Sequence, residues 1–131
     1  EIMVSRPVGK VWECWTRPEH ITQWNNASDD WCTPSARLDL RPGGSFLYRM
    51  ESTDGSMGFD FEGQFDEVRE QELIAYTIAD GRKVKLVFES GNGRTKVTEH
   101  FEAENIHDVA LQRQGWQAIL DNFKRYAESA V

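Results

Sequence analysis

The sequence predicts a single α+β domain over residues 1–131, built from a curved antiparallel β-sheet wrapped around a long C-terminal α-helix. Two patterns lead to this prediction. Between residues 36 and 104, large apolar residues alternate with mainly polar ones. Turn signals interrupt this alternation at regular intervals, as in an antiparallel meander. From residue 109 onward, the apolar spacing changes to that of a helix. Strands followed by one long helix favour a sheet with that helix on one face.

A short strand and two short helices precede the alternating region. Proline suits the first position of a helix, and a serine shortly before it can act as the cap. Clustered Asn, Asp, Ser and Pro are typical of loops. We expect a strand end at residues 2–4, a helix opened by Pro7 with Ser5 as its candidate cap, a second helix over residues 18–24, and a loop over residues 25–35.

Tight turns separate the predicted strands that follow. Consecutive strands joined by such turns must pair antiparallel. A large antiparallel sheet twists and coils, and if it curls around the last helix, the two short helices must close its open edge. The turn signals are Pro42-Gly43-Gly44, Asp54-Gly55, Asp80-Gly81 and Gly91-Asn92-Gly93.

Composition limits the classes of function. The chain carries a net charge of −7 and has a sequence pI of about 4.9, whereas nucleic acids and anionic membranes attract basic surfaces. No apolar stretch is long enough to span a bilayer, and no secretory signal is visible. We expect Cys14 and Cys32 to be reduced thiols of a cytoplasmic protein, with a disulfide between them as the less favoured alternative. The sequence begins at Glu1, which leaves room for a preceding piece that includes part of the first strand.

The residues predicted to face the last helix are large and apolar. A pocket for a small apolar ligand is lined in this way, but a solidly filled core would give the same pattern, so both readings stay open. The candidate ligand-binding residues are Trp12, Trp24, Trp31, Phe46, Tyr48, Met50, Phe59, Phe61, Phe65, Tyr76, Phe88, Glu99, His100, Trp116 and Leu120.

The same segments resemble a known family. The motifs that carry the resemblance occur in order and span essentially the whole chain: Ser5-Arg6-Pro7-Val8, Val11-Trp12, Trp15-Thr16, Pro18-Glu19-His20-Ile21 with Trp24, Asp39-Leu40-Arg41-Pro42-Gly43-Gly44, and Gln114-Gly115-Trp116. Together they are similar to the proteins called activator of 90-kDa heat shock protein ATPase homologue-like, in the START-like or SRPBCC superfamily. The resemblance implies the helix-grip fold for the whole domain.

The function implied by this resemblance is broad. The superfamily includes lipid carriers, hormone receptors, aromatase/cyclases and oxygenase subunits, which share a cavity between the sheet and the long helix. The family name comes from eukaryotic co-chaperones in which such a domain follows a separate N-terminal domain. The present sequence shows no such domain and more resembles the bacterial members, for which ligand binding is the usual inference.

Two neighbouring residues of the last predicted strand are candidates for a polar anchor in the cavity. If Val97, Glu99 and Phe101 face inward, Glu99 is buried and needs a partner or a raised pKa, while His100 points to solvent. A β-bulge would instead turn His100 inward, where it could hold a ligand or shuttle a proton. The sequence leaves both registers open, and an ordinary structural role for either residue is the more common case.

The remaining polar residues fit structural roles. We interpret Asp29, Asp30 and Asp54 as solvated loop residues with Asx turns near the cavity mouth, and His20 and His107 as surface residues. No spacing matches a calcium loop, a zinc site, a nucleophile elbow or a phosphate loop. We therefore predict no catalytic residue, no metal and no cofactor.

Three functions are compatible with these observations. The first is binding of a small hydrophobic molecule such as a lipid or an aromatic, polyketide-like compound. The second is a cyclase- or hydrolase-type enzyme that uses a cavity carboxylate or His100. The third is a co-chaperone-like module that stimulates the 90-kDa heat shock protein ATPase. We favour the first, with no nucleic-acid partner and no membrane insertion, and expect a monomer or a weak homodimer.

Overall fold

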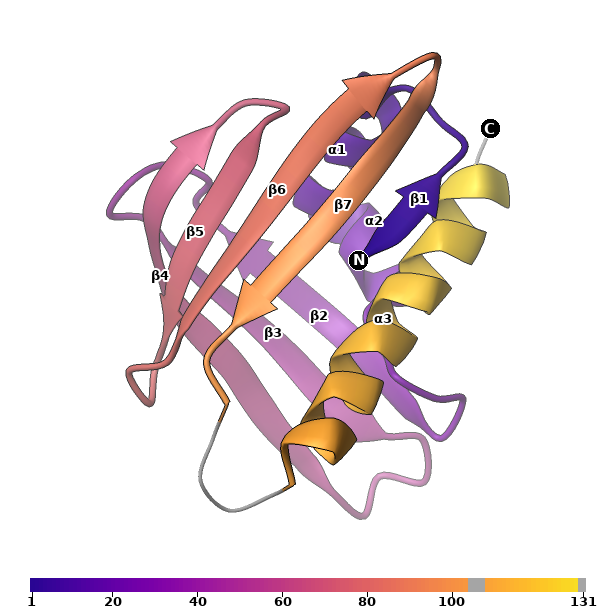
Figure 1. Ribbon diagram of the computed structural model, residues 1–131. Helices are drawn as coiled ribbons and strands as arrows, with labels where there is room; N and C mark the ends of the chain where they lie inside the picture. The colour runs from indigo at the N-terminus through magenta and orange to yellow at the C-terminus, as the bar shows by residue number, and fades with distance from the viewer. Residues whose placement is uncertain (104–107, 130–131) are drawn as a thin grey trace.

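The structure is a computed structural model that describes residues 1–103 and 108–129. Its order of one strand, two short helices, a run of strands and one long helix agrees with the order predicted from the sequence (Figure 1). The elements are β1 (Ile2–Val4), α1 (Val8–Thr16), α2 (Pro18–Trp24), β2 (Trp31–Leu38), β3 (Ser45–Ser52), β4 (Gly58–Arg69), β5 (Leu73–Ile78), β6 (Lys83–Gly91), β7 (Arg94–Phe101) and α3 (Val109–Ser129).

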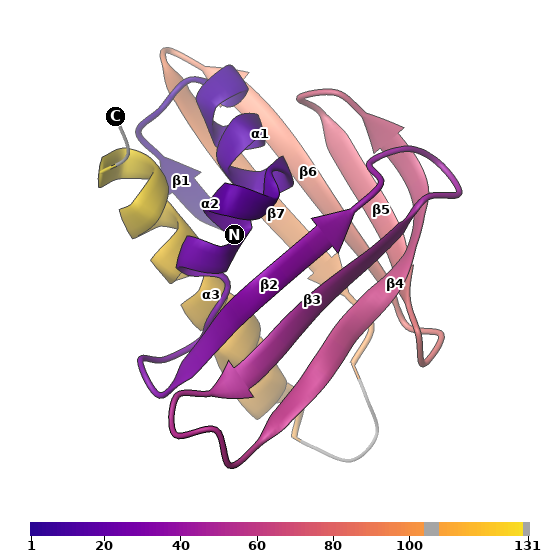
Figure 2. The ribbon, with the colours of Figure 1, turned by 180° about the vertical axis from the view of Figure 1, so that it is seen from behind.

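The strands form one antiparallel sheet in the order β1-β7-β6-β5-β4-β3-β2. Strands β2 to β7 follow one another as neighbours, and β1 crosses over to pair with β7. The sheet curls into a half-barrel, α3 lies across its open side, and α1 and α2 lie between its two edge strands (Figures 1 and 2). The predicted helix-grip architecture is therefore confirmed, including the place of the two short helices.

Three aromatic rings join the helices at one end of the half-barrel. Trp15 of α1 lies 4.6 Å from Trp24 of α2 and 4.7 Å from Phe123 of α3, and Trp24 lies 4.8 Å from Phe123, measured between ring centroids. The indole N–H of Trp24 donates to the carbonyl oxygen of Cys14 at 2.8 Å, so its polar atom is satisfied. Burial of one such side chain contributes roughly 1.5–3 kcal/mol. This cluster fixes α3 against both short helices.

Polar contacts set the position of α3 along the opening of the sheet. The Lys124 ammonium donates to the carbonyl oxygen of Met3 in β1 at 2.6 Å. The side-chain amide of Asn122 donates to the carbonyl oxygen of Trp24, the last residue of α2, at 2.7 Å. The helix is thus tied to the edge strand β1 and to the end of α2.

The predicted loop over residues 25–35 is too long, because β2 already begins at Trp31. Pro34 lies inside this strand. It is tolerated because β2 is an edge strand and its pairing with β3 shifts between Cys32 and Ser35, so the ladder requires no N–H from the proline.

Two further local predictions were wrong. Ser5 does not cap α1; the N-cap is Pro7, and the backbone N–H of Ser5 instead donates to Glu128 Oε2 at 2.7 Å. His20 is not a surface residue: its ring is largely buried, with Nδ1 2.5 Å from the Tyr126 hydroxyl. The backbone of Ser5 and the ring of His20 both contact α3, and local sequence does not reveal such contacts. His107 lies outside the described residues.

Cys14 is buried and Cys32 is half-buried, and both are free thiols, as expected from the sequence. Within residues 1–103 and 108–129, no helix is both long enough and apolar enough to cross a membrane.

Candidate ligand-binding site

A cavity of about 260 Å³ lies between the inner face of the sheet and α3. Its walls are mainly aromatic and aliphatic side chains. Because this volume is not occupied by protein atoms, the core is not completely filled here. The predicted residues that line it are Trp24, Phe46, Tyr48, Met50, Phe59, Phe61, Phe65, Tyr76, Glu99 and Trp116. Their contact with a ligand stays a prediction.

Phe46 is the centre of the aromatic floor of this pocket. Its ring centroid lies 5.0 Å from that of Tyr76, 5.2 Å from Tyr48, 5.3 Å from Phe65 and 5.7 Å from Phe61. Tilted and edge-to-face pairs of this kind restrain ring orientation beyond simple burial. The floor is therefore a fixed surface and not a set of loosely placed rings.

The roof of the pocket comes from α3. Trp116 stacks on Phe101 of β7 with a centroid separation of 4.8 Å and an interplanar angle of 13°, and its ring also lies 6.4 Å from Phe61. Beside it, Gly115 lines the pocket, and a Cβ placed on it would meet nothing within 4 Å. A helix with glycine at an interior position is less stable than the same helix with alanine there, by about 1 kcal/mol. The roof thus has open space at Gly115, where a larger residue would fit and would make the helix more stable.

Besides His100, four predicted residues lie away from the walls. Trp12 and Phe88 pack on each other with centroids 5.2 Å apart, where α1 lies directly on β6. Leu120 is 2% exposed and belongs to the core beneath α3. Trp31 packs on Phe59 at 5.9 Å without lining the pocket itself. The sequence pattern identified inward-facing residues but could not tell core from cavity wall.

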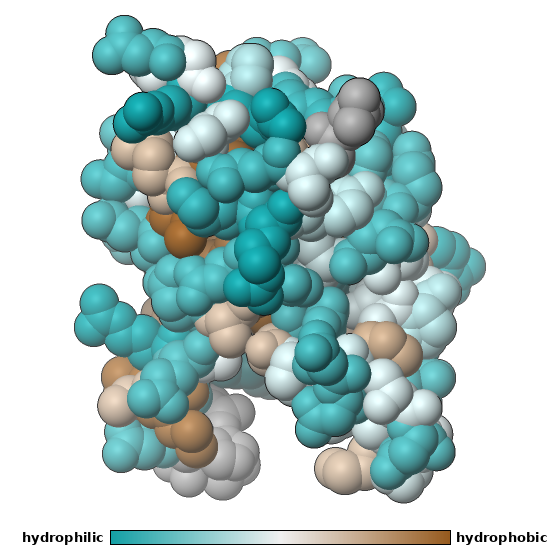
Figure 3. Space-filling view, turned by 90° about the vertical axis from the view of Figure 1, so that its right-hand side faces the viewer, coloured by the Kyte–Doolittle hydropathy of each residue, from teal (hydrophilic) through white to brown (hydrophobic). Residues whose placement is uncertain are grey.

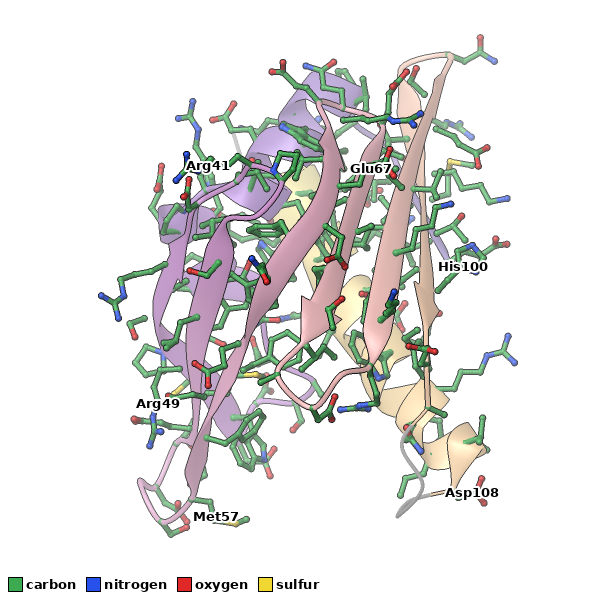
Figure 4. All side chains as sticks on the ribbon, turned by 90° about the vertical axis from the view of Figure 1, so that its left-hand side faces the viewer. Arg41, Arg49, Met57, Glu67, His100 and Asp108 are labelled. Carbon is green, nitrogen blue, oxygen red and sulfur yellow. The ribbon has the colours of Figure 1, made fainter. Side chains whose placement is uncertain are left out.

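The register of β7 decides between Glu99 and His100. Glu99 pairs with Leu86 and His100 with Lys85, and the pairing of β6 with β7 continues without a shift. His100 is exposed and points away from the inner face of the sheet (Figure 4). Its assignment to the pocket was wrong, because the bulge that would turn it inward is absent from β7.

Glu99 is the carboxyl group of the pocket wall. Burial raises its pKa from the ordinary value of 4.5 to about 8, and the amino group of Glu1 has a smaller, lowering effect on that pKa. The side chain keeps some accessible surface because the cavity lies in front of it. At neutral pH this carboxyl is mostly protonated and can donate a hydrogen bond.

Two tyrosines share the wall with this acid. Burial raises the pKa of the Tyr48 and Tyr76 phenols above their ordinary value of 10, so both keep their protons. Glu99 and Tyr48 each raise the pKa of Tyr76 further, which places each of them within electrostatic reach of Tyr76. The pocket therefore combines an apolar surface with a small group of O–H donors.

A notch in the surface lies at the end of the molecule where α3 begins. Figure 3 shows it at the lower edge, between the start of α3 and the hairpin of β3 and β4. Gln112 of α3 and Phe59 of β4 line the pocket. Exposed apolar side chains occur in both of these elements, since Met57 of the hairpin is 64% accessible and Leu111 of α3 is 57% accessible.

The three acids expected near the mouth have structural roles. The backbone N–H of Ser56 donates to Asp54 Oδ1 at 2.9 Å, and hydrogen bonds from Ser56 and Ser52 lower the pKa of Asp54 to about 2. Asp29 and Asp30 are exposed. The interpretation of these acids as solvated loop residues is confirmed. In residues 1–103 and 108–129, no three His, Cys, Asp or Glu side chains are grouped to hold a metal ion.

Sequence reasoning missed several wall residues. Leu38 and Leu40 alternate with polar residues and Ile119 follows the apolar spacing of α3, so periodicity could have identified all three. Asn25 and Ala27 follow α2 and have no periodic signal, because the fold alone brings this loop to the pocket wall. The remaining missed residues are Trp15, Thr16, Ile74, Gln112 and Gly115.

A second, larger hollow of about 730 Å³ lies against β2 to β5. Arg37, Asp39, Glu62 and Gln64 contribute to its walls, and all four are exposed. Its polar, solvent-facing character makes the interior cavity the stronger candidate for an apolar ligand.

Comparison with known proteins agrees with this architecture. The family described as Activator of Hsp90 ATPase homolog 1-like protein matches residues 5–128. A solution structure of an AHSA1-like protein from Aeromonas hydrophila is 45% identical, covers 98% of this chain and 91% of that chain, and superimposes with a TM-score of 0.92. A solution structure from Cytophaga hutchinsonii is 46% identical, covers 97% of this chain and 88% of that chain, and gives a TM-score of 0.84.

More distant structures share the fold alone. A crystal structure of a protein from Nitrosomonas europaea is 19% identical, covers 99% of this chain and 95% of that chain, and gives a TM-score of 0.78. A search of the curated proteins found no match.

Proposed function

Because the chain belongs to the family of Activator of Hsp90 ATPase homolog 1-like proteins, whose fold commonly binds hydrophobic ligands, we propose that it binds a small hydrophobic molecule in the cavity beneath α3. The observation that carries the proposal is the cavity itself, which is lined mainly by aromatic and aliphatic side chains. Pockets for small molecules have this character: concave, mostly apolar, and supplied with a few polar groups.

The size of the cavity limits the ligand. Pockets for drug-sized molecules span roughly 300–1,000 Å³, and the present cavity measures about 260 Å³. A compound of two or three fused rings, or a single short acyl chain, suits this space better than a two-chain phospholipid. The aromatic floor around Phe46 favours planar rings, because offset and edge-to-face ring contacts add to the energy of burial.

Gly115 supports the same proposal. Its position in α3 would gain helix stability from any ordinary side chain, and the structure has room for one. A residue that lowers the stability of the fold, and that packing does not require, is typical of a functional site. Here the missing side chain lets a ligand reach the backbone of α3 beside Trp116.

Native mass spectrometry of protein purified gently from its own host tests the proposal. We expect a fraction of the molecules to carry an additional mass that disappears after extraction with organic solvent. Re-addition of the extracted compound should raise the melting temperature, because a ligand that binds the folded state alone stabilises it by mass action. A single unliganded mass in repeated preparations, with no stabilisation by any hydrophobic extract, would refute the proposal.

One observation favours acid–base catalysis as a second candidate function. Such an enzyme needs an ionisable side chain that faces the cavity and has a perturbed pKa, and Glu99 meets both conditions. Turnover of a bound ligand that is lost in Glu99→Gln, with binding retained, would support this candidate. Stimulation of the 90-kDa heat shock protein ATPase rests on the family name, and an ATPase assay with the purified chaperone tests it.

A further inference from the structure

Three oxygen-bearing side chains enter the apolar pocket from different strands: Tyr48 from β3, Tyr76 from β5 and Glu99 from β7. Both tyrosine rings are held against Phe46, at 5.2 and 5.0 Å between centroids. Glu99 pairs with Leu86 of β6, and Leu86 pairs on its other side with Ile74 of β5, two positions before Tyr76. Tyr76 and Glu99 therefore stand diagonally on the same inner face.

These three groups have no hydrogen-bond partner among the residues that the structure describes. Every fully enclosed side-chain nitrogen or oxygen in that part of the chain does have a partner. The unpaired oxygens of Tyr48, Tyr76 and Glu99 must therefore have access to the pocket. Polar groups left unpaired in apolar surroundings are costly, so their convergence in one hollow calls for a ligand or bound solvent that pairs them.

We infer that Tyr48, Tyr76 and Glu99 form a donor site inside the pocket that binds an acceptor oxygen, such as a ketone carbonyl, on a small apolar ligand. This inference rests on the proposed function, since it names the chemistry of the ligand that the same pocket takes. Each phenol and the protonated carboxyl offers one O–H. A carbonyl oxygen has two lone pairs, so it can accept from two of these three donors at the same time.

An acceptor oxygen fits this site better than a cationic amine. An ammonium group would need the carboxylate form of Glu99, whereas burial raises its pKa to about 8 and keeps the carboxyl protonated at neutral pH. On the floor, the phenols of Tyr48 and Tyr76 line the same pocket as Glu99, and both keep their protons. The roof residues of α3 that line the pocket carry no ionisable group, and the Glu1 amino group acts weakly.

Three naphthalene derivatives of nearly equal shape test the inference: acetylnaphthalene as the acceptor, isopropylnaphthalene as the hydrocarbon, and naphthylethylamine as the cation. Their dissociation constants are measured by equilibrium dialysis at pH 6.5 with the wild-type chain and with Tyr76→Phe, Glu99→Leu and Glu99→Gln. The exposed acid Glu89, on the neighbouring strand β6, supplies the matched control Glu89→Gln.

The decisive quantity is the change in affinity for the ketone relative to the hydrocarbon. We expect Tyr76→Phe and Glu99→Leu each to weaken ketone binding by about three- to tenfold, the value of one hydrogen bond, and to leave hydrocarbon binding unchanged or tighter. Glu99→Gln retains a donor and should lose less. Glu89→Gln should change neither affinity.

The outcomes separate the inference from the proposed function. Equal effects of the substitutions on ketone and hydrocarbon, or preferred binding of the amine, would overturn the donor site while leaving the pocket a hydrophobic binding site. Failure of all three compounds to bind would overturn the proposed function and the inference with it. A further readout is pH: ketone binding should weaken as pH rises above about 8, where Glu99 ionises and can no longer donate.

Discussion

The ring of Phe46 lies over Gly63, its cross-strand partner on β4, so closely that a Cβ on Gly63 would stand 2.9 Å from two of the ring carbons. The same Cβ would lie 2.3 Å from the backbone carbonyl oxygen of Thr77. The floor of the pocket is therefore flat at this point because β4 carries no side chain there, and this contact leads to the first prediction.

Gly63→Ala should destabilise the fold by about 1–3 kcal/mol, since the backbone of β5 and the ring of Phe46 must both shift. The control is Gly91→Ala on β6, where a Cβ would meet nothing within 4 Å; this change should be neutral or slightly stabilising. Urea denaturation of both variants measures the difference. Equal stabilities of the two variants would contradict the contact.

Gly115→Leu should reduce ligand binding without unfolding the protein. The new side chain enters the open space of the pocket roof and also favours the helix, so the free energy of unfolding should stay equal or rise by about 1 kcal/mol. The control Gln114→Leu places the same side chain at an exposed position of α3. Thermal denaturation and ligand titration together check the prediction; a Gly115→Leu protein that binds normally would show that the roof is not part of the site.

Glu99→Gln should remove a pH dependence of stability. The pKa of Glu99 is about 8 in the folded chain against 4.5 ordinarily, so between these values the folded state holds a proton that the unfolded state has released. Stability then falls as pH rises from about 4.5 to about 8, by up to about 1.4 kcal/mol per pH unit for a single group.

The measurement is urea denaturation of wild type, Glu99→Gln and the control Glu89→Gln at pH 5, 6, 7 and 8. Relative to wild type, Glu99→Gln should become progressively more stable toward pH 8, because the glutamine amide never ionises. Glu89→Gln should follow the wild-type profile. Parallel profiles for all three proteins would mean that Glu99 is not held protonated by burial.

Asn122→Ala should destabilise the protein by about 1–2 kcal/mol, because the amide of Asn122 donates to the carbonyl oxygen of Trp24 at 2.7 Å and to Asn26 Oδ1 at 3.0 Å. These bonds tie α3 to the loop after α2, from which Asn25 and Ala27 line the pocket. The exposed change Gln114→Ala on the same helix serves as the control and should cost little. Chemical denaturation measures the free energy of unfolding of both variants. An equal loss of stability in Asn122→Ala and Gln114→Ala would contradict the role of Asn122.

Local sequence predicted much of the fold because its signals are themselves local. The two-residue alternation around Phe46 and Phe61 assigned strands and their inward faces correctly, and the proline at position 18 separated the two short helices. The same reasoning placed β2 too late, because the tolerance of an edge strand for Pro34 depends on the neighbours of that strand in the sheet.

The sequence predicted the type of site, an apolar pocket, but only some of the residues that line it. Large inward-facing aromatics indicated a pocket, yet Trp12 and Phe88 pack on each other while Trp15 and Gly115 line the wall. Inward orientation is a property of one strand or helix. Whether an inward side chain meets a neighbour or empty space depends on how far apart two elements lie, and this distance is not encoded locally.

The sequence by itself determined the order of elements, the inward face of strands such as β3 and β4 and the acidic character of the chain, since these follow from periodicity and composition. Only the tertiary structure decided that Glu99 and not His100 faces the interior, and that space remains between the sheet and α3. The physical reason is that strand register and helix-to-sheet spacing are set by contacts between residues far apart in the chain, such as Trp24 with Phe123 and Phe101 with Trp116.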